Sequence, residues 1–79
     1  MPDLRVRVEL VEADIEAGFC LVDSVEMYPA QVTRLVADAE EVFADAVTRL
    51  NSLQASEREK FRPLMSELRR AIDLALPPS

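Results

Sequence analysis

The sequence has no histidine and no tryptophan, and it has only one cysteine and one glycine among its 79 residues. A single thiol, Cys20, forms no internal disulfide and cannot complete a closed zinc site without further nitrogen or sulfur ligands. A single glycine excludes the glycine-rich loops that cradle phosphates. Serine nucleophiles need a base, usually histidine, so that class of hydrolase is excluded as well. We therefore expect a protein that is not an enzyme, with no catalytic residue, cofactor or metal ligand.

Basic charge and long apolar runs are also scarce. Nine basic residues stand against fifteen acidic ones, a formal net charge of −6, which argues against nucleic acid and against an anionic membrane surface as partners. The longest uninterrupted apolar run, 19–22, has four residues, whereas a bilayer-spanning helix needs about 20. With no visible signal peptide and one unpaired cysteine, the sequence predicts a cytoplasmic location.

The length allows one domain, 1–79. A domain of this size hides only about 60% of the surface that its unfolded chain exposes. Small domains therefore often gain stability from a disulfide, a metal or a second copy of the chain. The first two are not available to this sequence, so self-association is the remaining route.

What the sequence does have is three segments in which apolar residues recur at alternating steps of four and three. Such steps keep side chains on one side of an α-helix. We call these residues the inward positions: Leu4, Val8, Val11, Ile15, Gly18, Val22 and Val25, then Val32, Val36, Ala39, Phe43, Ala46, Leu50 and Leu53, then Phe61, Met65, Leu68, Ile72 and Ala75. Three helices of this kind bury their apolar sides against one another. The pattern predicts an all-α, antiparallel up-down-up three-helix bundle.

Turn signals place the expected helices at about 4–27, 30–53 and 57–76. Proline disfavours helical geometry in the residue before it and suits the first turn of a helix, so the first helix should end near Tyr28 and the second begin after Pro29. Ser56 and Glu59 match a capping box, which predicts that the third helix starts at Glu57. Pro63 lies inside that helix and removes one hydrogen bond, so we expect a kink there rather than a stop.

Two features of the first segment leave alternatives open. Residues 4–10 alternate apolar and polar side chains, which is typical of a strand. We favour a helix because the seven-residue rhythm continues through them without a break. Gly18 occupies an inward position and should permit a close helix crossing, although a glycine can also bend or break a helix.

The first segment is apolar on a second side as well. Opposite its inward positions, a further set steps by four and three, and we call this set the outer flank: Val6, Leu10, Ala13, Ala17, Cys20 and Ser24. A helix at the edge of a bundle needs only one apolar side, so the outer flank predicts an interface, most simply a homodimer. Arg5, Arg7 and Glu9 would set the orientation at its edge. The alternatives are that the other two helices bury it, or that its small residues are tolerated in water.

The remaining chemical groups favour structural explanations. Cys20 has no basic neighbour at helical spacing and is expected to be a packed, unreactive thiol. Two rows of carboxylates, Glu9, Glu12 and Glu16 and then Asp38, Glu41 and Asp45, lie off the inward positions and are interpreted as solvated faces rather than a metal site.

Ala39, Phe43 and Ala46 stand at the spacing of the Ala, Phe and Ala positions in the second helix of a tetratricopeptide unit. The layout resembles tetratricopeptide-like helical hairpins, the microtubule-interacting-and-trafficking module and small uncharacterised bacterial three-helix proteins. The resemblance implies a helical architecture and no activity. The predicted function is a non-catalytic protein-interaction module. The alternative is a small acidic regulatory or antitoxin-like protein that masks a basic partner.

Overall fold

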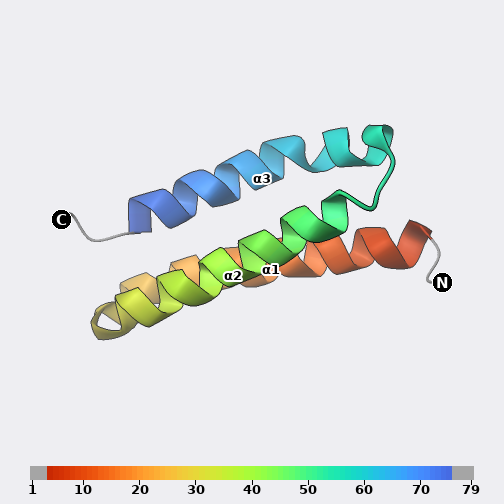
Figure 1. The fold of residues 1–79 in the computed structure, drawn as a ribbon. Helices are drawn as coiled ribbons and strands as arrows, with labels where there is room; N and C mark the ends of the chain where they lie inside the picture. The colour runs from red at the N-terminus through yellow and green to blue at the C-terminus, as the bar shows by residue number, and fades with distance from the viewer. Residues whose placement is uncertain (1–3, 76–79) are drawn as a thin grey trace.

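The computed structural model describes residues 4–75, which form three α-helices and one short 3₁₀ turn. The elements are α1 (Leu4–Met27), η1 (Pro29–Gln31), α2 (Val32–Leu50) and α3 (Ala55–Ala75). α2 runs back along α1, and α3 returns along the pair in the direction of α1 (Figure 1). The all-α, up-down-up bundle is confirmed. Residues 4–10 belong to α1, so the helical interpretation of this segment is correct and the strand alternative is wrong.

The core is built from the inward positions of all three helices. Val11 and Ile15 of α1 pack with Ala46, Leu53, Phe61 and Met65 in one cluster. A second cluster joins Val36, Ala39, Leu68 and Ile72, with Val22 and Val25 of α1 packed against it. Phe19 and Phe43 touch both clusters, so the two halves form one continuous core. The periodicity therefore identified the buried side of every helix.

Gly18 brings α1 and α3 together. It is buried in an unbroken α1, which excludes a helix break at this position. A β-carbon added there would lie 2.9 Å and 3.0 Å from the two methyl carbons of Leu68. Such distances are shorter than a normal carbon–carbon contact, so the absence of a side chain at Gly18 makes room for Leu68.

The helix bounds differ from expectation at two turns. α1 ends at Met27 as predicted, but the helix after Pro29 begins as the 3₁₀ turn η1 and becomes α-helical only at Val32. α2 then ends at Leu50, not at Leu53. Leu53 is nevertheless buried, and its amide donates to the carbonyl of Leu50 at 3.0 Å. The apolar spacing of α2 continues into the turn although the helix does not. The spacing therefore predicted a helix end three residues too far along the chain.

α3 begins at Ala55, two residues before the predicted start. The carbonyl of Gln54 accepts from the amides of Glu57 and Arg58, at 3.0 Å each. Ser56 thus lies inside the first turn, and the capping-box prediction is wrong. The carboxylate of Glu59 instead faces Arg62 at 3.5 Å.

The helix continues through Pro63, so this proline does not end α3, as expected. The kink at Pro63 stays a prediction.

Candidate interaction surfaces

The outer flank of α1 lies at the surface of the monomer. Val6 and Leu10 are 41% and 40% exposed, and Ala13, Ala17 and Cys20 are also exposed. The prediction that Cys20 is packed is therefore wrong for the monomer, because its side of α1 faces away from the core. Ser24 is half-buried, and its hydroxyl donates to the carbonyl of Cys20 at 2.8 Å within α1. Neither α2 nor α3 covers this set, so the alternative of internal burial is wrong. The outer flank is therefore available to another molecule.

The N-terminal end of the outer flank reaches the end of α2. Leu10 lines a small hollow of about 180 Å³ together with Arg7, Arg49 and Ser52. The side chain of Arg7 donates to the carbonyl of Ser52 at 3.5 Å, and Arg49 pairs with Asp14 at 2.8 Å. These contacts tie α2 to α1 beside the outer flank. Of the three residues expected at its edge, Arg5 and Glu9 form an exposed pair at 3.6 Å.

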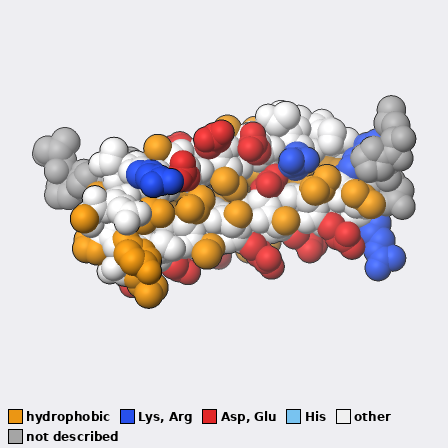
Figure 2. All heavy atoms as spheres, turned by 90° about the horizontal axis from the view of Figure 1, so that it is seen from below, with side chains coloured by type: hydrophobic (Ala, Val, Ile, Leu, Met, Phe, Trp, Pro, Cys, Tyr) orange, Lys and Arg blue, Asp and Glu red, His pale blue; other side chains and the backbone are white. Residues whose placement is uncertain are grey.

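Acidic side chains border the apolar surface of α1 and α2. Figure 2 shows apolar side chains along the middle of this side of the molecule, with carboxylates above and below them. On α1, Glu9, Glu16 and Asp23 are exposed and follow one another at seven-residue intervals. We call these three residues the acidic row. They lie along one edge of the outer flank because a seven-residue step is close to two full helical turns.

A second apolar surface, which the sequence did not predict, lies between α2 and α3. It is an open groove of about 760 Å³, lined by α2, the turn after it and α3. We call it the α2–α3 groove. Its apolar lining includes Phe43, Val47, Leu50, Met65 and Leu74. Val47 is 38% exposed and Leu74 is 76% exposed, so large apolar side chains at this surface are open to water.

Arginines of α3 give the groove a basic edge. Arg58, Arg62 and Arg70 line it, and Ser66 stands between the last two at the same four-residue spacing. We call Arg58, Arg62 and Arg70 the basic row. Arg62 faces Glu59 at 3.5 Å with both side chains exposed. Arg58 and Arg70 have no ion pair with any residue of 4–75, so two cations of this row are free to meet a carboxylate from elsewhere.

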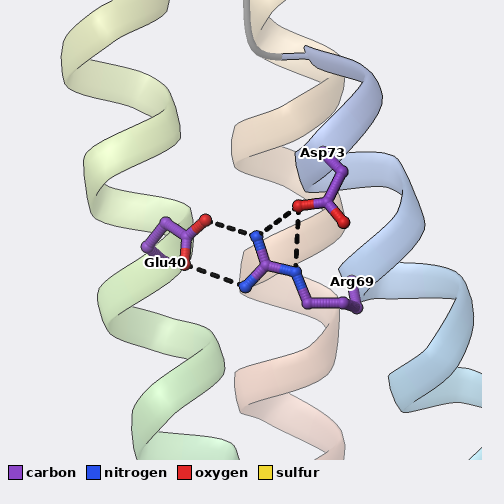
Figure 3. A network of polar contacts seen from close by, with 3 residues as sticks. All are labelled: Glu40, Arg69 and Asp73. Carbon is purple, nitrogen blue, oxygen red and sulfur yellow. Dashed lines mark hydrogen bonds and ion pairs between the residues drawn. The ribbon is translucent and has the colours of Figure 1, made fainter.

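A fourth arginine connects the two walls of the groove. Arg69 of α3 donates two hydrogen bonds to the carboxylate of Glu40 on α2, one of them 2.9 Å long, and also binds Asp73 at 2.7 Å (Figure 3). Its guanidinium carbon lies 5.1 Å from the centre of the Phe43 ring. These hydrogen bonds hold the pKa of Glu40 below its ordinary value of 4.5 and raise the pKa of Arg69. The network fixes α3 against α2 at one part of the groove.

These arginines alternate with acidic residues along 57–73, a pattern that is typical of a solvated helix face. The signal that could have singled out Arg69 is its place directly after the inward residue Leu68, just as Glu40 directly follows inward Ala39. Residues beside the inward positions of adjacent helices commonly form ion pairs across a helix junction. No comparable signal marks the groove, because its width depends on how far apart α2 and α3 lie.

The part of the chain from 4 to 75 contains no group of three cysteine, aspartate or glutamate side chains placed to hold a metal ion. All buried side chains in this part are apolar. None of its helices has the length and hydropathy that a bilayer crossing demands.

Comparisons of the chain with protein-family models, curated proteins and solved structures give no match. The resemblance to tetratricopeptide-like and microtubule-interacting-and-trafficking-like layouts stays a prediction. The function is therefore argued from the two surfaces described above, the outer flank and the α2–α3 groove.

Proposed function

We propose that the protein is a non-catalytic protein-interaction module that self-associates through the outer flank of α1. The observation that carries this proposal is that α2 and α3 leave the flank open, with Val6 and Leu10 each about two-fifths exposed. Covering such side chains is favourable by roughly 25 cal/mol for each Å² of apolar surface removed from water. The small residues Ala13 and Ala17 let another backbone approach closely. A second copy would supply the burial that a domain of this size lacks.

A reducing compartment such as the cytoplasm suits this proposal. Cys20 is a free, exposed thiol within the outer flank. In an oxidising compartment, copies held together through this surface would risk disulfide formation between exposed thiols. The location is part of the proposal and rests on this argument.

The proposal is tested by placing a charge in the outer flank. Ala13→Glu and Ala17→Glu each bury a carboxylate against the apolar part of the interface, which is costly without a partner for the charge. Both variants are expected to keep their helical circular dichroism and to fall to the mass of one chain, 8.9 kDa, in light scattering. Ala37→Glu makes the same substitution at an exposed site of α2 and should keep the wild-type mass. Equal masses for the wild type and both folded flank variants would remove the proposal.

The second candidate function is the small acidic regulatory or antitoxin-like protein that masks a basic partner. The carboxylates bordering the apolar surface in Figure 2 favour it. Contact between opposite charges at exposed sites weakens with salt, whereas an apolar interface does not. Pull-down of a basic partner that survives high salt would therefore count against this candidate, and one lost at high salt would support it.

A further inference from the structure

We propose that the α2–α3 groove receives the outer flank of α1 from a second copy of the chain. The inference rests on the proposed self-association and names the surface that the outer flank meets. Both surfaces are apolar and open to water in the monomer. Val47 and Leu74 are exposed at the groove, and Val6 and Leu10 are exposed on the flank.

The charges beside the two surfaces are opposite. The basic row lies along the groove, and the acidic row lies along the outer flank. The ends of the basic row are twelve positions apart on α3, about 18 Å, and the ends of the acidic row are fourteen positions apart on α1, about 21 Å. The two rows are thus similar in length. Arg58 and Arg70 have no ion pair with residues 4–75, and neither do Glu16 and Asp23, so the rows could pair along much of their length.

A symmetric pair of outer flanks has the less favourable charge arrangement. In a two-fold interface the same surface meets itself. In an antiparallel two-fold pair, the acidic rows of the two copies lie on the same edge of the interface, and like charges brought together are destabilising. The basic side chains beside the outer flank, Arg5, Arg7 and Arg49, lie at its N-terminal end. The groove lining instead holds four arginines, Arg58, Arg62, Arg69 and Arg70, against two carboxylates, Glu59 and Asp73.

A chain cannot fill its own groove with its own outer flank. The inward positions of α1 contact α2 and α3 through both core clusters. The outer flank lies on the opposite side of α1 from these contacts, with Leu10 near Arg49 and Ser52 at the end of α2. The occupant of the groove must then come from another molecule. A contact between two different surfaces leaves one groove and one flank open after two chains have joined, so further copies can add.

Two variants separate the surfaces. Ala17→Lys places a cation within the apolar outer flank, where it would be buried against the groove, and it leaves the groove intact. Arg58→Glu/Arg70→Glu reverses two charges of the basic row and leaves the flank intact. Each variant alone is expected to have the 8.9 kDa mass of one chain in light scattering. An equimolar mixture should form particles of two chains, because one intact flank meets one intact groove and no further copy can add.

Controls and salt dependence complete the test. Arg34→Glu removes an exposed arginine of α2 outside the groove and should associate like the wild type. Circular dichroism checks that each variant keeps its helices, and Arg58→Gln/Arg70→Gln replaces the double reversal if that variant unfolds. Wild-type association should weaken as salt screens the opposite charges.

The outcomes distinguish this inference from the proposed function. If the groove variant associates like the wild type while Ala17→Lys does not, the flank self-associates by another route and this inference is overturned. Two monomeric variants that stay monomeric when mixed also overturn it. If Ala17→Lys and Ala17→Glu both associate like the wild type, the proposed function itself fails.

Discussion

Gly18 shows how one missing side chain sets the distance between two helices. A β-carbon added at Gly18 would lie 2.9 Å from a methyl carbon of Leu68. This position in the unbroken α1 therefore has space only for a hydrogen atom. Leu68 is fully buried, so its methyl groups have little room to move aside. Glycine lowers the intrinsic stability of a helix by about 1 kcal/mol relative to alanine.

Gly18→Ala is expected to lower the free energy of unfolding by about 1 kcal/mol, because the cost of overpacking exceeds the gain in helix propensity. In a Leu68→Val background, which removes the obstructing methyl positions, the same change should raise stability. Urea unfolding followed by circular dichroism measures both differences. A gain of equal size in both backgrounds would show that Leu68 does not limit the approach of α1.

At the scale of elements, α3 is attached to α2 by polar contacts as well as by the core. Arg69 binds Glu40 across the two helices and lies over Phe43. Both charged side chains are partly exposed, which limits what such a pair adds to stability. The two-pronged geometry of the guanidinium still fixes their orientation. The network therefore holds one part of the α2–α3 groove at a defined width.

Glu40→Gln is expected to lower stability by up to about 1 kcal/mol at neutral pH. Because folding lowers the pKa of Glu40, its ionised carboxylate stabilises the folded state. This stabilisation is fully present at pH values above the ordinary pKa of 4.5. The contribution disappears as the pH falls through the lowered pKa. Urea unfolding curves of wild type and variant should differ at pH 7 and converge once the pH lies below the lowered pKa of Glu40. Glu41→Gln, at the neighbouring exposed site, is the control and should show little difference at either pH.

The buried side of each helix could be predicted because apolar residues recur at alternating steps of four and three in all three helical segments. The inward residues Phe61, Met65, Leu68 and Ile72 are all buried as expected. Helix ends were harder, since local hydrogen bonds decide them. Gln54 accepts the first amides of α3, although Ser56 has the better capping side chain. The outer flank was predicted and is exposed, but the groove depends on the separation of two helices, which no local pattern encodes.

At the scale of the whole molecule, the distribution of charge matters more than its sum. A net charge of −6 would by itself keep copies apart. The acidic row lies beside one apolar surface, however, and the basic row lies beside the other. This separation lets copies attract one another at specific surfaces. A core of this size supplies only about 3–5 kcal/mol, so association would add a meaningful share of the total stability.

The mass of the wild-type protein in solution tests the central claim most directly. Light scattering over a series of concentrations should give at least twice the 8.9 kDa of one chain, rising as the concentration increases. The open outer flank of α1 would then have found a partner in another copy. A mass of 8.9 kDa at every concentration would contradict self-association.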